Sequence, residues 1–249
     1  MSPLLVLVIL VVSALGTAFL SSIFGMLGGL VLMGVLVNIF PVSLAMLLHG
    51  IIQLTSNGYR AWLNREHVLW PIVLSLFLGN LAVFFMLYFM SFVPDRITVL
   101  FVLGLMPYIA WLLPEDFSPD VTRKPVGFLA GMVVVGSNLL AGVGGPLLDI
   151  FFQKVNMTRY QVVATKAVAQ SLGHISKILF FGSLLYLGPG NPDLSAWVVF
   201  LAMTASVLGT TMGKKILDKL EDATFFAWTQ RIVLGVGAVF ILQAIYLLL

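Results

Sequence analysis

The sequence predicts an all-α polytopic membrane protein with about eight transmembrane helices in two homologous repeats. Three observations support this fold class. Of the 249 residues, 60% are hydrophobic and only 9% are charged, whereas a typical soluble domain has about 25% charged residues. The apolar residues form runs long enough to cross a bilayer. A polar segment close to the middle of the chain separates two halves with similar patterns.

The composition also excludes several classes of protein. A chain this apolar is not expected to be a soluble enzyme, a secreted scaffold or a nucleic-acid binder, so nucleic acid is not an expected partner. The excess of 13 Lys and Arg over 10 Asp and Glu is small and is attributed to loop orientation in the membrane. Because Cys is absent, disulfides and thiolate metal sites are excluded. Because no basic region precedes the first apolar run, we interpret this run as a retained membrane span and not as a signal peptide.

Polar or proline-containing positions divide the chain into eight apolar segments. A bilayer core of about 30 Å requires about 20 residues of helix. In chain order we expect helices within residues 4–40, 42–63, 68–92, 96–113, 125–152, 159–187, 196–214 and 225–249. The first and fifth segments are longer than one crossing requires, and each contains a glycine cluster. Because glycine is flexible and Pro146 lacks a backbone donor, each of these two segments is predicted to be a broken helix.

An internal duplication accounts for the similarity of the two halves. We place the first repeat at 1–113, a polar connecting loop at 114–124 and the second repeat at 125–249. When Gly28 is laid on Gly145, an offset of 117 residues, Gln53 falls on Gln170 without a gap. The same offset pairs His49 with Lys166, Asn57 with His174, and Arg60 with Lys177. Such repeats are common in secondary transporters, whose substrate sites lie between the two halves.

These polar positions recur every three or four residues, so in each half they form one stripe along a helix. Charged groups that face lipid are costly, and the two stripes are therefore predicted to line a polar, positively biased cavity. The glycine breaks would add free backbone N–H groups at the start of each resumed helix, which favour an anion. The candidate substrate-binding residues are Gly25, Gly28, Gly29, Gln53, Asn57, Gly142, Gly144, Gly145, Gln170, His174 and Lys177.

Structural interpretations of the same residues remain open. Arg60 and Lys166 lie near helix ends, where their side chains can extend to the membrane interface. His174 and Lys177 can make structural hydrogen bonds, and the two glutamines can pack between helices. Asp149 is expected either to bind a proton or to form an ion pair with Lys166 or Lys177. His49, Asp149 and Lys166 are therefore candidates for proton coupling or for charge pairing, and His174, as the second imidazole of the stripes, is also a candidate for proton coupling.

The chain contains no motif of a known catalytic or nucleotide-binding site, and its His residues lack metal-ligand spacing. We therefore expect no enzymatic activity, no cofactor and no bound metal. The paired motifs are Phe24-Gly-Met-Leu-Gly-Gly-Leu30 with Pro41-Val-Ser-Leu-Ala45, and Ala141-Gly-Val-Gly-Gly-Pro-Leu147 with Met157-Thr-Arg-Tyr-Gln-Val-Val-Ala-Thr165. This pattern resembles the sulfite exporter TauE/SafE family of bacterial membrane proteins, over nearly the whole chain. His49 and Lys166 stand where that family often has a small or hydroxyl residue.

The resemblance implies a transporter of small anions, such as sulfite, organosulfonates or related sulfur oxyanions, in the cytoplasmic (inner) membrane. We expect a multi-pass secondary transporter that exports or exchanges its anion by alternating access, with proton coupling left open. The expected partners are the small anionic substrate, the lipid bilayer and a second copy in a homodimer. A passive anion channel and a membrane partner subunit without cargo remain the alternatives.

Overall fold

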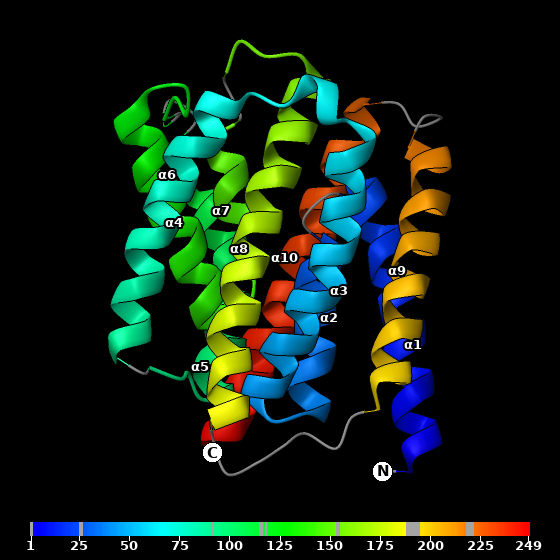
Figure 1. Ribbon diagram of the computed structural model, residues 1–249. Coiled ribbons are helices and arrows are strands. Elements are labelled where there is room, and N and C mark those ends of the chain that lie inside the picture. The colour runs from blue at the N-terminus through cyan, green and yellow to red at the C-terminus, as the bar shows by residue number, and fades with distance from the viewer. Residues whose placement is uncertain are drawn as a thin grey trace.

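The computed structural model describes residues 2–24, 27–90, 92–114, 117, 119–152, 155–187, 195–217 and 222–249, and all regular structure within them is helical. The helices form one bundle with both termini at the same end (Figure 1). They are α1 (Pro3–Phe24), α2 (Leu27–Ile39), α3 (Val42–Leu63), the 3-10 turn η1 (Arg65–His67), α4 (Trp70–Met90), α5 (Arg96–Leu112), α6 (Lys124–Ala141), α7 (Gly145–Ile150), α8 (Arg159–Leu187), α9 (Ala196–Leu217) and α10 (Asp222–Leu248).

Six of the described helices are long and apolar enough to cross a membrane: α1, α4, α6, α8, α9 and α10. Many large apolar side chains on them face outward, including Phe89, Tyr186 and Trp197. An outward apolar surface suits lipid and not water. Length and composition therefore support a multi-pass membrane protein. The sequence predicted about eight spans. The two predicted spans outside these six are α3, which carries the polar stripe, and α5, which is shorter than the six.

Both long segments are divided into two helices. The first is divided between Phe24 and Leu27, and Gly25 lies outside the described residues. The second is divided at Gly142, which ends α6 in the left-handed conformation with φ of 82° and donates its N–H to Asn138 O at 2.9 Å. Glycine adopts this conformation without the steric cost that a Cβ would add.

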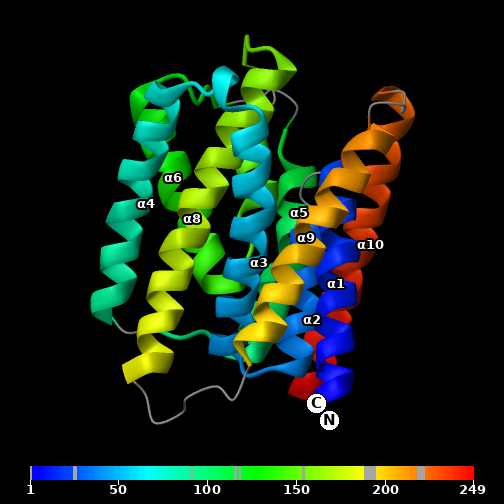
Figure 2. The same cartoon turned by 45° about the vertical axis from the view of Figure 1, so that its right-hand side comes forward.

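The two broken segments turn back instead of continuing in one direction. In Figure 1, α1 starts at the end where the termini lie, and α3 starts again from that end after α2. In the same view, α6 and α8 both start at the opposite end of the bundle. The helices α3 and α8 consequently run antiparallel, and Figure 2 shows them crossing the centre of the bundle. The two halves therefore have opposite orientations.

The packing of helices joins one half of the chain to the other. Gly209 of α9 lies against the backbone of Leu15 in α1, and Gly79 of α4 lies against the backbone of Phe128 in α6. Two hydrogen bonds also join the two halves. Ser56 Oγ lies 2.9 Å from Thr210 Oγ1, and Ser176 donates to Asn80 Oδ1 at 2.9 Å. These hydrogen bonds connect α3 to α9 and α8 to α4, respectively. Each half therefore packs largely against the other.

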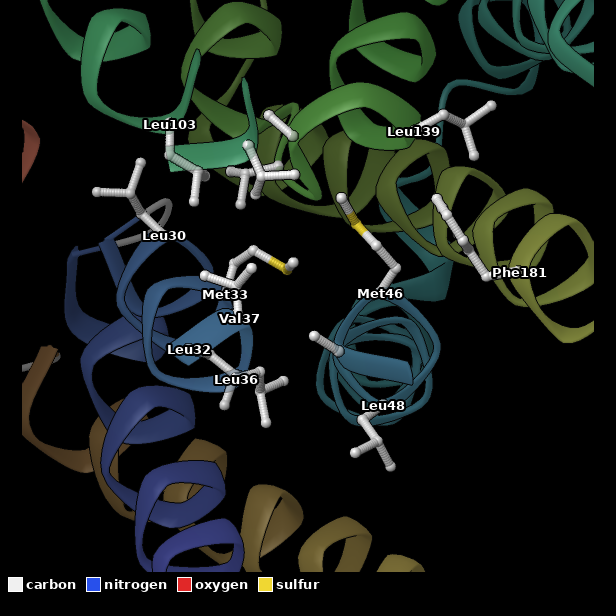
Figure 3. Close-up of a cluster of buried hydrophobic side chains, with 14 of the residues drawn as sticks. Leu30, Leu32, Met33, Leu36, Val37, Met46, Leu48, Leu103, Leu139 and Phe181 are labelled. Atoms are coloured by element: carbon white, nitrogen blue, oxygen red, sulfur yellow. The ribbon is translucent and has the colours of Figure 1, made fainter. Parts of the chain in front are cut away.

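The main hydrophobic core surrounds α2. Figure 3 shows Leu30 and Met33 of α2, Met46 of α3 and Leu103 of α5 around the same interior space. Most residues of α2 are buried, although the helix has only 13 residues. A helix too short to cross a bilayer leaves unpaired backbone groups at its ends, which are tolerated at membrane depth only inside protein or a wet cavity. The core supplies that environment for α2.

Candidate functional site

A cavity of about 40 Å³ lies where the polar stripes of α3 and α8 meet the two broken segments. Its lining comes from α1, α2, α3, α6, α7, α8 and the α6–α7 connection. The polar side chains that line it are Ser21, His49, Gln53, Asn57, Asn138, Gln170 and His174. The glycines that line it are Gly29, Gly144, Gly145 and Gly173. The cavity volume is sufficient for about three water molecules.

The lining contains pairs of residues at the same offset along the chain. Gln53 and Gln170, Asn57 and His174, and Ser21 and Asn138 are each separated by 117 residues. Because α3 and α8 are antiparallel, positions with this offset approach one another only near the middle of the two helices. Ser21 and Asn138 were not among the predicted site residues. The signal that could have identified them is the same offset, applied to the helices that precede the glycine clusters.

Several lining side chains have free hydrogen-bonding groups. No described residue hydrogen-bonds to the side-chain amides of Gln53, Asn57 or Gln170. His174 is only 7% exposed, and its Nδ1 has no hydrogen-bond partner among the described residues. Buried polar groups are nearly always hydrogen-bonded to protein or to water. These amides and this imidazole are therefore available to water or to a ligand, and amide N–H groups are suitable donors to an anion.

Lys177 lies behind the cavity wall and is fully buried. Its Nζ donates to Gly142 O at 2.7 Å and to Asn138 Oδ1 at 3.1 Å, and lies 2.7 Å from His49 Nδ1. The other ring nitrogen of His49, Nε2, lies 3.0 Å from Gly29 O. A carbonyl oxygen accepts only, so His49 carries its proton on Nε2 and presents the Nδ1 lone pair to Lys177. The three protons of the ammonium group thus have three protein acceptors.

This network connects the two glycine clusters. It extends from Gly29 of α2 through His49 and Lys177 to Gly142 at the end of α6. Lys177 was predicted to contact the substrate, but in this structure its protons are occupied and it does not line the cavity. No described carboxylate lies within ion-pair distance of Lys177. Its positive charge is therefore not neutralised by the described part of the protein, and it favours an anion in the adjacent cavity.

Asp149 of α7 forms an ion pair with Lys166 of α8. Of the two predicted roles of these residues, the structure thus contains charge pairing. The partner of Asp149 is Lys166 and not Lys177. The side chains of Asp149 and Lys166 are about a quarter exposed. Arg60, which aligns with Lys177, does not line the cavity, and its Nη2 has no partner among the described residues.

The glycines have two kinds of position. Gly29 and Gly145 line the cavity, and a Cβ at Gly29 would overlap the Gln53 amide. Gly28 does not line it, because it packs against Thr17 and Ser21 of α1, where a Cβ would overlap both. Close packing against α1 accounts for Gly28, whereas the close approach of the Gln53 amide accounts for Gly29.

The arrangement has the chemistry of a small anion site. It offers neutral amide donors and two imidazoles beside a buried ammonium group, and none of the described residues that line it carries a carboxylate. Within the described residues, no group of three or more His, Cys, Asp or Glu side chains could hold a metal ion. An anion in the cavity would gain charge-assisted hydrogen bonds and a favourable electrostatic field.

Comparison with known proteins assigns the chain to a family. A family model described as sulfite exporter TauE/SafE matches residues 9–243, which include both glycine clusters and all the residues that line the cavity. No curated protein and no solved structure matches the chain. The family match agrees with the apolar helical bundle and with the anion-favouring cavity. The chain therefore belongs to the sulfite exporter TauE/SafE family of membrane transport proteins.

Proposed function

We propose that this protein is a secondary transporter that exports or exchanges a small sulfur-containing anion, such as sulfite or a compact organosulfonate, across the cytoplasmic membrane. The observation that carries the proposal is the cavity. Its amides and the His174 imidazole have no hydrogen-bond partner among the described residues, and they lie beside the buried charge of Lys177, which no described carboxylate neutralises. The family assignment supports anion transport. The volume of about 40 Å³ favours a compact anion over a long organic molecule.

We further propose that the chain consists of two homologous repeats and that they move by alternating access. Three features support this. The halves have opposite orientations, helices of each half pack against helices of the other, and residues at the 117-residue offset line one cavity. In transporters with inverted repeats, rocking of one repeat against the other exposes a central site to each side of the membrane in turn. The broken segments, which form much of the lining, are the elements expected to move.

The test compares two glutamines on α8. Gln170 lines the cavity, whereas Gln161 lies more than two turns away and caps the start of the helix with Thr158. In the purified full chain, we expect thiosulfate or methanesulfonate to raise the unfolding temperature, because a ligand that binds only the folded state stabilises it. Loss of one hydrogen bond to a charged ligand costs about 1.5–3 kcal/mol. Gln170→Ala should therefore weaken binding at least about tenfold, and Gln161→Ala should not.

Transport is then measured after reconstitution into liposomes. Entry of labelled thiosulfate or methanesulfonate that saturates with concentration, and that slows in Gln170→Ala but not in Gln161→Ala, would support the proposed transporter. Equal binding and entry in the two variants would show that the cavity is not the site. A large ionic conductance in a planar bilayer would identify a channel and contradict alternating access.

A further inference from the structure

We infer that His174 is a proton-binding site whose proton accompanies the anion, so that the transported species is the anion together with one H⁺. This inference rests on the proposed anion transport and adds its co-substrate. It is based on the place of the His174 side chain in the cavity lining, on its partnerless Nδ1 among the described residues, and on the neighbouring charge of Lys177.

The first step is the free nitrogen. His174 lines the cavity, and its Nδ1 is buried without a partner among the described residues. His49, the other cavity imidazole, differs because its Nε2 is held by Gly29 O and its Nδ1 by Lys177. Protonation of His49 would remove the acceptor of Lys177 and place two cations in direct contact. His174 is thus the cavity imidazole that can accept a proton without breaking a described hydrogen bond.

The second step is the charge around His174 on every element that packs against α8. Lys177 lies one turn away on α8 itself, and the His49 ring of α3 lies 5.7 Å from the His174 ring, centroid to centroid. At this level α6 contributes the neutral Asn138, and the carboxylate of α7, Asp149, is paired with Lys166. The ionisable group of α4, Tyr88, packs near Phe180, almost two turns beyond His174. The charged turn η1, which includes Glu66, lies at the other end of α8, where His67 packs beside Tyr160, almost four turns before His174. Tyr59 and Arg60 lie near the end of α3 and do not line the cavity. No described carboxylate therefore neutralises a proton on His174.

The third step is linkage between the two ligands. In the empty cavity, the ammonium group of Lys177 opposes a second positive charge on His174. An anion in the cavity offsets that repulsion and accepts a hydrogen bond from the protonated ring, so anion and proton each favour binding of the other. The balance is one H⁺ added to the His174 lone pair for each anion bound, with both released together. For a monovalent anion the net transported charge is zero, and the anion and pH gradients set the direction of transport.

The experiment uses methanesulfonate, which stays ionised across the working pH range, so any proton that moves with it does so through the protein. In the purified full chain, we expect its affinity to fall about tenfold per pH unit once His174 is deprotonated in the empty protein, as required by uptake of one proton. Calorimetric titration in two buffers with different ionisation enthalpies counts the protons taken up directly. In liposomes with an internal pH dye, an inward methanesulfonate gradient should acidify the lumen, and an imposed membrane potential should leave the rate unchanged.

The variant His174→Asn carries at this position the residue found at the equivalent position 57. We expect it to bind methanesulfonate with an affinity that no longer depends on pH, without proton uptake. His67→Asn is the matched control, because His67 lies in η1 beside Tyr160, outside the cavity, and it should retain the pH dependence. Should His174→Asn fail to fold, His174→Gln, which also lacks a titratable group, takes its place with the same expected results.

The outcomes distinguish the inference from the function beneath it. Methanesulfonate binding and transport without proton uptake, or proton uptake that persists in a folded His174→Asn, would overturn the role of His174 and leave anion transport intact. If neither methanesulfonate nor thiosulfate binds or moves, the proposed function fails and the proton site fails with it. Release of a proton on binding would instead indicate antiport and contradict the proposed linkage.

Discussion

Gly142→Ala tests whether the second helix break depends on its backbone conformation and its packing. An L-residue in the left-handed region costs roughly 1–2 kcal/mol. A Cβ at Gly142 would also lie 2.5 Å from Met33 Sδ and 2.7 Å from Met33 Cγ, inside the main core. Overpacking of this kind typically costs about 1–3 kcal/mol. The two contributions together predict that the free energy of unfolding falls by about 2–5 kcal/mol.

The matched control is Gly16→Ala in α1. A Cβ at Gly16 meets no atom within 4 Å, and among the described glycines only Gly142 has a positive φ. Alanine in a helix interior is favoured over glycine by roughly 0.5–1 kcal/mol, so Gly16→Ala should be neutral or stabilising. The two glycine-to-alanine changes should therefore shift stability in opposite directions.

The assay is thermal unfolding of the detergent-purified full chain. A chain of about this size shifts its midpoint by roughly 2–4 °C per kcal/mol, so Gly142→Ala should lower the midpoint by about 4–20 °C. Combining Gly142→Ala with Met33→Ala in a double-mutant cycle isolates the steric part, since contacting residues show coupling energies of about 0.5–3 kcal/mol. An unchanged midpoint for Gly142→Ala, or the same shift as for Gly16→Ala, would refute the reasoning.

Two further predictions concern a buried and an exposed polar group. Lys177→Met leaves three buried acceptors without their donor, and each unsatisfied acceptor costs about 1–3 kcal/mol of stability. This cost is partly offset because the variant no longer buries a charge. We expect a net loss of stability and of anion binding in the assays above, and wild-type binding would contradict the role of its charge. Asp95 caps α5 by accepting from Thr98 N at 2.9 Å, so Asp95→Ala should cost about 1 kcal/mol at neutral pH. Hydrogen bonds from Thr98 hold the Asp95 pKa below its usual range, so this stabilisation is present at neutral pH and is lost as the pH falls through the folded-state pKa. The difference in unfolding midpoint between wild type and Asp95→Ala should accordingly vanish in strong acid, and a constant difference would contradict the assignment.

Local sequence signals predicted much of the fold. The segment expected at 42–63 coincides with α3. The prediction was possible because a run of apolar residues and the proline before it are local features of the sequence. The stripe spacing of Gln53 and Asn57 placed both on one helix face, and both line the cavity with Gln170 and His174. The order and spacing of the glycine motifs indicated the family, and the family match confirms it.

Other features could not be read from local signals. The sequence left open whether Asp149 pairs with Lys166 or Lys177, because the choice depends on how α7 lies against α8. It also placed Lys177 at the substrate, since burial and three internal acceptors are not visible in helical spacing. The partners of Lys177 lie 35, 39 and 128 residues away along the chain, so only folding brings them together.

The sequence by itself determined that this chain is an apolar, helical membrane protein with two long segments that contain glycine clusters, and with matched polar stripes. These properties follow from composition and short-range periodicity, which each stretch of chain carries on its own. Only the tertiary structure decided that the broken segments turn back, that the stripes meet in one cavity, and that Lys177 is held behind the cavity wall while the His174 Nδ1 is left without a described partner. The physical reason is that direction, burial and hydrogen-bond partners depend on distances between helices far apart in sequence.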